Sequence, residues 1–353
     1  MNNLRSSLLV LSFLLLIGAG CFGGGNAPTA GTGGIWVSDN DGSSWVSKSV
    51  LPTATGSASI NGLDILAIAQ DPSDSSVVYV GSKTSGLFYS LDGGESWQRP
   101  KHQVAASGAV LAIEVDPRNV CTYYVLKSDR VLKTDTCGRE FDTDTYVETR
   151  SDETLTALAL DWYNPDSVFI GTSEGDVLRS LDGGQTWKAV LRARNNITDI
   201  EISNSDSRIV MAGTRSDGIY RSTDSGANWT NLETAFKDYK KANNVFDFSQ
   251  TDDGSRLLVR SAYGLTYSDD AGLTWQPINL VSSAGEVLVR AAALSATNKQ
   301  VIYYSSGSTF YTSNSGGDAW STTNLPTTRA ASVIYADEGK NGRVFLGVAA
   351  LDD

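Results

Sequence analysis

The chain has 353 residues and a formal net charge of −12 at pH 7, from 28 basic and 40 acidic residues. A surface this acidic does not suit nucleic acid, which proteins bind mainly through Lys and Arg. With one histidine, His102, and three cysteines, the chain has too few ligands for the usual His/Cys metal sites. We therefore expect no nucleic-acid partner, no bound metal and no cofactor, and we interpret His102 as an ordinary loop residue.

Residues 1–20 have the pattern of a signal peptide that is removed after export. Arg5 gives a positive start, and residues 8–17 form an apolar stretch too short to span a bilayer comfortably. Small residues then precede Cys21, which resembles the bacterial lipobox, although Gly18 stands where that motif usually has leucine. The resemblance implies lipid attachment at Cys21 and a protein anchored to a membrane of the bacterial cell envelope. The alternative is an ordinary signal peptide with an incidental cysteine.

Residues 21–33 are predicted to be a lipidated, flexible tether, because they are rich in glycine and carry no charge. The folded domain is predicted to cover residues 34–353. Its first strand, residues 34–38, aligns with residues 86–90 and 176–180, which are third strands of their repeats. The first repeat therefore lacks its first two strands at this end of the chain.

Two strands at the other end supply the missing pair. Residues 331–337 and 343–349 are rich in the apolar and β-branched side chains typical of strands. We predict that these C-terminal strands pair with the N-terminal ones in one sheet, which closes a ring and leaves no long exposed edge.

An eight-residue pattern, S-x-D-x-G-x-[ST]-W, recurs along the domain and is clearest at Ser180–Trp187 and Ser90–Trp97. Looser copies occupy residues 38–45, 222–229, 268–275 and 313–320, and an eroded copy occupies residues 134–141. A period of roughly 40–50 residues with several short strands per repeat is typical of propeller blades. The sequence therefore predicts an all-β, seven-bladed β-propeller with four-stranded antiparallel blades.

Each residue type in the pattern has a physical purpose in a tight turn between two strands. The Asp carboxylate accepts hydrogen bonds from the turn's own N–H groups, and the Gly adopts a positive φ. The Trp offers a large apolar area to bury. We interpret the turn as a self-contained structural unit. Its assigned residues are Asp92, Gly94, Trp97, Asp182, Gly184, Trp187, Asp224, Gly226, Trp229, Asp270, Gly272 and Trp275.

These residues resemble the Asp-box, or BNR repeat, of bacterial sialidases, sortilin-type receptors, xyloglucanase-type glycoside hydrolases and photosystem II assembly/stability factors. In those families the box lies at the blade periphery, so the resemblance implies a structural role. The segment Asp39-Asn40-Asp41-Gly42 begins like a calcium loop, but its twelfth position is Val50 instead of the required Glu. We expect no metal there.

Blade four illustrates the strand scheme, with strands predicted at residues 156–161, 167–172, 176–180 and 186–190, from the channel outward. Blades two to seven are all expected to have four strands. Helical periodicity is weak and is confined to residues 232–241.

Cys121 and Cys137 lie nearly opposite one another across the hairpin between the second and third strands of blade three. An exported protein can form this disulfide, worth roughly 3 kcal/mol in the chain-entropy model. Blade three also carries the eroded turn, so we predict that the disulfide replaces a turn that has failed. The alternative is two unrelated buried thiols.

Basic residues collect in the segments that join the outer strand of one blade to the inner strand of the next. The candidate partner-binding residues are Arg99, Lys101, Arg192, Arg194, Arg215, Lys240 and Lys241. Residues 142–154, on the same predicted face, are acidic. A basic sector on an acidic protein favours docking of an acidic partner. Ordinary solvated loop charge is the alternative.

An enzymatic function would need catalytic carboxylates. The inner strands carry Asp64, Glu114, Asp199, Glu201 and Asp247, none of them in a recognised catalytic motif. The Arg-Ile-Pro sequence of sialidases is absent. Xyloglucanase-type enzymes use a cleft, usually between two tandem propellers, whereas this chain holds one. We therefore assign no catalytic residue.

Trp162 and Tyr163 have the character of a sugar-stacking platform. The strand scheme places them on the side of the eight-residue turns, opposite the usual ligand face of propellers. We therefore predict that they pack within their own turn.

A lipobox, a short tether and one seven-bladed Asp-box propeller resemble the photosystem II assembly/stability-factor-like group. There the propeller is a binding scaffold for membrane-protein assembly, and a basic patch on one face is part of the picture. The resemblance implies an envelope-anchored, non-catalytic scaffold that binds a membrane-associated protein through the inter-blade loops. The alternative is a carbohydrate-active enzyme or glycan-binding propeller that uses the same face.

Overall fold

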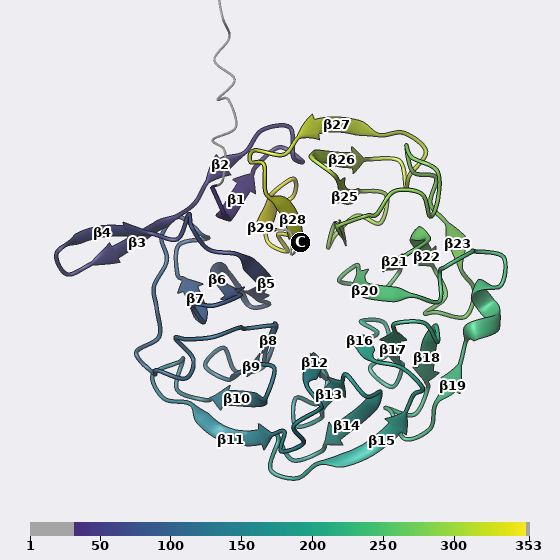
Figure 1. Ribbon diagram of the computed structural model, residues 1–353, viewed down its shortest axis with the longest axis horizontal. Coiled ribbons are helices and arrows are strands. Elements are labelled where there is room, and N and C mark those ends of the chain that lie inside the picture. The colour runs from purple at the N-terminus through teal and green to yellow at the C-terminus, as the bar shows by residue number, and fades with distance from the viewer. Residues whose placement is uncertain (1–31, 351–353) are drawn as a thin grey trace, which may run out of the picture.

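The computed structural model describes residues 32–350. The predicted signal peptide, Cys21 and most of the tether therefore lie outside the described residues. Seven antiparallel sheets stand around a central channel as the blades of a propeller (Figure 1), which confirms the predicted fold class. Helical structure in the described part is confined to one 3₁₀ turn, η1 (Glu233–Phe236), within the segment where helical periodicity was weak. No helix in the described part is long and apolar enough to cross a membrane.

Blade four has the predicted order from the channel to the rim: β12 (Leu155–Leu160), β13 (Val168–Thr172), β14 (Asp176–Ser180) and β15 (Lys188–Arg192). Four further blades repeat this order. They are β8 (Ala112–Val115), β9 (Tyr123–Leu126), β10 (Arg130–Thr134) and β11 (Asp142–Val147) in blade three; β16 (Ile197–Ile202), β17 (Val210–Thr214), β18 (Ile219–Ser222) and β19 (Thr230–Asn231) in blade five; β20 (Val245–Gln250), β21 (Leu257–Ser261), β22 (Gly264–Ser268) and β23 (Gln276–Pro277) in blade six; and β24 (Ala291–Leu294), β25 (Ile302–Ser306), β26 (Thr309–Ser313) and β27 (Ser321–Asn324) in blade seven.

Blade one closes the ring as predicted, because it takes strands from both ends of the chain. Its sheet runs β28 (Ala330–Ala336), β29 (Val344–Ala349), β1 (Gly34–Ser38) and β2 (Val46–Ser47). The β1–β29 pair is antiparallel, with Trp36 opposite Leu346. The seam is thereby paired within one sheet and leaves no open edge between the two ends of the chain.

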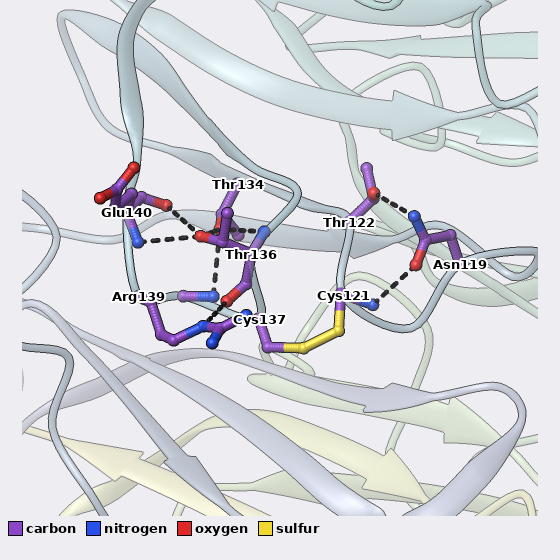
Figure 2. The surroundings of a disulfide bond; sticks show 9 residues. Asn119, Cys121, Thr122, Thr134, Thr136, Cys137, Arg139 and Glu140 are labelled. Carbon is purple, nitrogen blue, oxygen red and sulfur yellow. Dashed lines mark hydrogen bonds between the residues drawn. A yellow bond between two sulfur atoms is a disulfide. The ribbon is translucent and has the colours of Figure 1, made fainter.

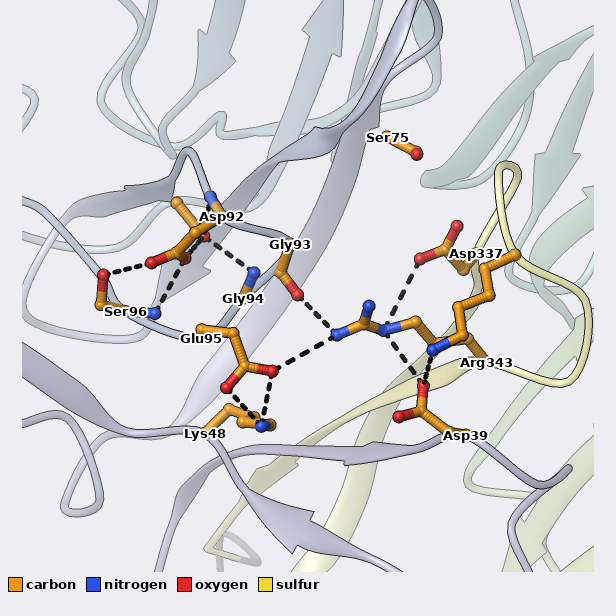
Figure 3. Close-up of polar contacts among 12 residues, drawn as sticks. Asp39, Lys48, Ser75, Asp92, Gly93, Gly94, Glu95, Ser96, Asp337 and Arg343 are labelled. Carbon is orange, nitrogen blue, oxygen red and sulfur yellow. Dashed lines mark hydrogen bonds and ion pairs between the residues drawn. The ribbon is translucent and has the colours of Figure 1, made fainter.

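A polar cluster fastens blade one to blade two (Figure 3). The Arg343 guanidinium donates to the Gly93 carbonyl at 2.8 Å and pairs with Asp39 at 3.5 Å. Lys48 pairs with Glu95 at 2.5 Å. Because Arg343 and Asp39 come from opposite ends of the chain, this cluster supports the closure made by the sheet.

Blade two departs from the predicted four strands. It has β5 (Ile65–Asp71), β6 (Asp74–Ser82) and β7 (Leu87–Ser90), and its fourth strand is a single bridge between Tyr89 and Gln98. Pro100, two residues later, has no N–H to continue the ladder. An additional hairpin of β3 (Val50–Thr53) and β4 (Gly56–Ser59), which was not predicted, projects from the ring beside this blade (Figure 1).

The hydrophobic core lies between the blades. Seven clusters of buried side chains each join one blade to the next. In one of them Phe169 of blade four packs with Ile197 and Ile200 of blade five. The inner strands surround a channel of about 820 Å³ whose walls include many alanines. A blade alone cannot bury its apolar faces, so the whole ring folds as one unit.

Candidate functional site

The turn of blade four shows how a regular Asp-box is held. Asp182 Oδ1 accepts from the Thr186 N–H at 2.8 Å, and Oδ2 accepts from the Thr186 hydroxyl at 2.6 Å. Ser180 Oγ accepts from the Gly184 N–H at 2.8 Å and donates to Asp182 at 2.7 Å. The hydrogen bonds from Thr186, followed by the one from Ser180, lower the pKa of Asp182 to about 2. The carboxylate is fully occupied by its own turn, as a structural role requires.

The same turn also joins neighbouring blades, so the interpretation of a self-contained unit is wrong. Gly226 has a φ of +82°, and a Cβ there would lie 2.7 Å from Phe169 of the preceding blade. In four turns, the carbonyl of the residue just before the motif glycine accepts a hydrogen bond from a side chain of the preceding blade. These bonds are Lys133 to Gly183 at 2.9 Å, Arg221 to Ala271 at 2.8 Å, Thr312 to Asp41 at 2.7 Å and Arg343 to Gly93 at 2.8 Å. The glycine is needed for close approach as well as for its backbone conformation.

Three of the motif tryptophans also contact the preceding blade, whereas the Trp229 indole donates to Gly226 O of its own turn. The indole N–H of Trp97 donates to Lys48 O at 2.9 Å, and that of Trp187 donates to Thr145 O at 2.8 Å. Trp320 donates to Asn279 O at 2.7 Å. Each of these three acceptors lies in the blade before, a contact that the repeat pattern alone does not reveal because it fixes spacing within a blade and not orientation between blades.

In blade three the eroded turn keeps the same hydrogen bonds with different groups (Figure 2). Thr134 Oγ1 accepts from the Gly138 N–H at 3.0 Å, as Ser180 does for Gly184. Thr136 Oγ1 accepts from the Glu140 N–H at 2.9 Å, in place of a carboxylate. The predicted disulfide between Cys121 and Cys137 is present. It supplements a working turn, so the prediction that it replaces a failed one is wrong.

The central channel brings three of the five candidate catalytic carboxyls together. Glu114 lies on β8, and Asp199 and Glu201 lie on β16, on either side of the alanine-lined β12. Burial, and then the Asp199 charge, raises the pKa of Glu114 to about 8. Burial, and then the Asp247 charge, raises the pKa of Asp199 to about 7. Burial and its two neighbours also hold the pKa of Glu201 well above its usual range.

The other two candidates are neutralised by arginine. Asp247 makes a bidentate pair with Arg260, with 2.6 Å between Nη2 and Oδ2. Asp64 pairs with Arg329 and accepts from the Ala350 N–H at 2.8 Å. Asp247 lines the channel and its charge acts on Asp199, so it belongs with the three protonatable carboxyls, whereas Asp64 is not among the lining residues.

The seven candidate partner-binding residues all lie exposed on the inter-blade loop face, in two groups. Arg99 and Lys101 lie between blades two and three, and the other five lie over blades four to six. The acidic segment from Glu148 to Glu153 separates the groups, and Arg150 pairs with both of these glutamates. The acidic segment predicted on this face is thus present at residues 148–153, whereas residues 142–147 form β11.

Most of these basic side chains have local partners. Arg99 donates to the Ser85 and Ala106 carbonyls, and Arg192 lies 3.4 Å from Asp176. Arg194 pairs with Asp217, and Lys241 donates to Gly285 O at 2.8 Å. The remaining contacts are few: Arg215 lies over the Phe246 ring at 5.5 Å, while Lys101 and Lys240 make no hydrogen bond or ion pair within residues 32–350.

The aromatic pair of blade four divides into two roles. The Trp162 indole donates to Ser203 O of the next blade at 3.0 Å, so its packing is not confined to its own turn as predicted. Tyr163 is 73% exposed, and Trp162 also lines the channel opening on the Asp-box side. His102 contacts the Phe141 ring at 5.6 Å between centroids and lies in a loop, as predicted.

Comparison with known proteins agrees with this geometry. The BNR/Asp-box repeat family matches residues 88–99, and the lipoprotein LpqB β-propeller domain family matches residues 126–240. The chain is a seven-bladed Asp-box β-propeller. A xyloglucanase from a Paenibacillus species is 30% identical over an alignment of 186 residues, and the match covers 46% of this chain and only 16% of the relative's length.

Two kinds of solved structure share this propeller fold at low sequence identity. The GH74 xyloglucanase from Xanthomonas campestris has a TM-score of 0.63 and 15% identity, over 81% of this chain and 51% of that one. The structure of YCF48 bound to D1 peptide has a TM-score of 0.60 and 16% identity, over 81% of this chain and 94% of that one. YCF48 from Cyanidioschyzon merolae is similar, with a TM-score of 0.60, 14% identity, and coverage of 81% and 95%. At these identities the likeness establishes the fold alone.

Proposed function

We propose that the protein is a non-catalytic, envelope-anchored scaffold that binds a membrane-associated protein through its inter-blade loop face. The observation that carries the proposal is that all seven candidate basic residues lie on the face where the chain enters the ring. Gly34 N–H donates to Leu63 O at 2.8 Å, and Leu63 precedes the inner strand of blade two on this face. A lipid at Cys21 would therefore hold this face toward the membrane, within the reach of a short tether.

The neighbour with a bound peptide supports the same proposal. This chain covers 94% of the YCF48 chain whose structure contains D1 peptide, against 51% of the Xanthomonas xyloglucanase chain. A single propeller ring is thus enough for peptide binding in that neighbour. We carry over only the class of partner, a protein segment.

Affinity capture from detergent-solubilised envelopes tests the scaffold function. The variant combines Lys101→Glu, Arg215→Glu and Lys240→Glu, three side chains without an acidic partner within residues 32–350. The control combines Arg118→Glu, Arg139→Glu and Lys188→Glu, which makes the same charge change on the Asp-box side. We expect one identified partner to be retained by the wild type and the control and lost by the variant. Equal capture by all three proteins would mean that the loop-face charge is merely solvated.

A glycoside hydrolase is the second candidate, and the channel carboxyls favour it. Glu114 and Asp199 have pKa values raised to about 8 and about 7, the range in which a carboxyl serves as a general acid near neutral pH. The similarity to a xyloglucanase makes xyloglucan the substrate to test. Release of reducing ends from xyloglucan, abolished by Glu114→Gln or Asp199→Asn in a folded protein, would establish the enzyme and defeat the non-catalytic proposal.

A further inference from the structure

The walls of the central channel carry many acids and no base. Six carboxyl side chains line it: Glu114, Asp199, Glu201, Asp247, Asp252 and Glu338. Within residues 32–350, no Lys, Arg or His is among the lining residues. Carboxylates gathered in one cavity of about 820 Å³ repel one another unless protons or cations neutralise them. The channel therefore needs a source of positive charge that its own walls do not supply.

One of the six carboxyls has a basic partner beside the channel. Asp247 pairs with Arg260, with 2.6 Å between Oδ2 and Nη2, and the other five make no ion pair within the described part of the chain. Arg260 also donates to Val289 O at 3.0 Å and lies over the Phe246 ring at 4.9 Å. These contacts fix the guanidinium next to Asp247, so it does not neutralise the remaining acids.

Three of the carboxyls approach one another from different blades, and we name them the carboxyl triad. Glu114 lies on β8 of blade three, and Asp199 and Glu201 lie on β16 of blade five. β12 stands between these strands (Figure 1) and contributes only Ala159 and Leu160 to the lining. The charges of Asp199 and Glu114 both act on Glu201, so the triad connects blades three and five across blade four.

Neutral groups orient the triad. Asp199 accepts from the Phe248 and Ile200 N–H groups at 2.9 Å each. Glu201 accepts from the side-chain amide of Gln250. Neutral donors satisfy carboxylate oxygens without balancing the charge, so these hydrogen bonds do not remove the repulsion within the triad.

The other titratable groups of the channel lie nearer the Asp-box side. Glu338 accepts from the Tyr335 hydroxyl at 2.6 Å. Burial, and then the charges of Asp252, Asp337 and Asp71, raises the pKa of Glu338 against that hydrogen bond. β5, β12 and β24 contribute no titratable side chain to the lining. Every group that faces the triad, apart from the arginine paired with its neighbour, is therefore acidic or neutral.

We propose that the carboxyl triad is a pH-sensitive contact between blades three and five, which stabilises the ring while its members share protons and destabilises it when they ionise. A protonated carboxyl donates as well as accepts, whereas ionised carboxylates only accept and repel. A metal ion fits less well, because the described residues contain no group of three His, Cys, Asp or Glu side chains arranged to hold one. This contact does not depend on the loop-face partner or on catalysis.

The direction of the pH dependence follows from the shifted groups. Burial, and then like charges, raises the pKa of Glu114 from 4.5 to about 8 and that of Asp199 from 3.8 to about 7. The folded ring therefore holds protons that the unfolded chain releases. The stabilisation is complete below about pH 4 and is lost as the pH rises through 7 and 8.

Thermal unfolding of the full chain from about pH 5.5 to about pH 8.5 tests the proposal. The variant Glu114→Gln/Glu201→Gln keeps the side-chain shapes and removes two titrating groups. Over this range the Tm of the wild type should fall by about 6 °C more than that of the variant. The control Asp152→Asn/Glu174→Gln removes the same charge from exposed acids on the loop face, and its Tm should fall in parallel with the wild type. Parallel curves for all three proteins would overturn the proposal.

Two measurements on the wild type do not depend on whether the variant folds. NMR of the side-chain carboxyl carbons should show resonances that titrate with midpoints of about 7 and about 8. Midpoints that all lie below about pH 5.5 would contradict the proposal. Spermidine and calcium, each at about 1 mM, should raise the Tm at alkaline pH by less than about 2 °C. A larger rise with either would mean that a bound cation, and not shared protons, neutralises the channel.

Discussion

The turns of blades three and four have nearly the same hydrogen bonds but very different sequences. In blade four, Asp182 and Ser180 accept from the backbone, and in blade three Thr136 and Thr134 do so at nearly equal distances. What the turn requires is two oxygen acceptors and a glycine. The carboxylate and the tryptophan are therefore replaceable.

The largest expected difference between the two turns comes from the disulfide, which only blade three has. Cys121 and Cys137 are 16 residues apart, so the chain-entropy model gives a loss of about 3 kcal/mol on breaking the bond. Urea unfolding of Cys121→Ser/Cys137→Ser, compared with wild type under oxidising conditions, measures this loss. If the variant and the reduced wild type are as stable as the oxidised protein, the disulfide does not stabilise this blade.

The glycine common to both turns should give the next largest effect. Gly226→Ala places a Cβ 2.7 Å from Phe169 and keeps a positive φ, so we expect a loss of about 2 kcal/mol. Gly307→Ala is the matched control, because its φ is +57° with nothing within 4 Å of the new Cβ. It should cost about 1 kcal/mol from the backbone alone. Equal losses in urea unfolding would mean that contact with the preceding blade is unimportant.

Substitution of the Ser180 and Thr134 hydroxyls tests whether the two turns are equivalent. Ser180 and Thr134 are 1% and 2% exposed, and each accepts from two backbone N–H groups. Ser180→Ala and Thr134→Ala should each cost about 1.5 kcal/mol in urea unfolding, because the N–H groups lose their partner. Thr134→Ser should be nearly neutral. A much smaller loss at Thr134 than at Ser180 would show that the turn of blade three depends on its disulfide instead.

The smallest expected effect is a difference between the two turns in how low pH weakens their hydrogen bonds. The pKa of Asp182 is lowered to about 2 from an ordinary value of 3.8, chiefly by the hydrogen bonds from Thr186. Its stabilisation is therefore complete above pH 4 and is lost as the pH falls through 2. The Thr136 hydroxyl does not titrate in this range. Amide hydrogen exchange should show protection of the Thr186 N–H falling with acid while that of Glu140 N–H stays constant. Parallel loss at both amides would indicate a global cause.

The sequence predicted the fold because its evidence is local. Each eight-residue turn is recognisable because its motif residues are close in sequence and contact one another. The strands on either side are recognisable from alternating apolar and polar residues. Ring closure was predictable because one blade visibly lacked two strands that the other end of the chain supplied. The disulfide was predictable from the hairpin that brings Cys121 and Cys137 together. The absence of a full fourth strand in blade two was not predictable, because Pro100 ends a strand only where its missing N–H would have paired with the neighbouring strand.

The candidate sites were predicted less well, for a physical reason. Position along a strand indicated which acids face the channel, but not that the Asp199 charge helps to raise the pKa of Glu114, or that Asp247 pairs with Arg260. These interactions join residues on different strands or blades. Loop segments likewise indicated which basic and acidic residues share a face, but not which of the basic side chains pair with local partners such as Asp176 and Asp217.

The amino-acid sequence by itself determined the seven blades, their turns and the closure of the ring, since these follow from residue patterns within one repeat. The tertiary structure decided what lies between the blades: the hydrogen bonds from one blade to the turn of the next, and the carboxyls that meet in the channel. Lys133 and Gly183, for example, are 50 residues apart in the chain. Contacts at that separation depend on how the blades pack, and a repeat pattern does not specify packing.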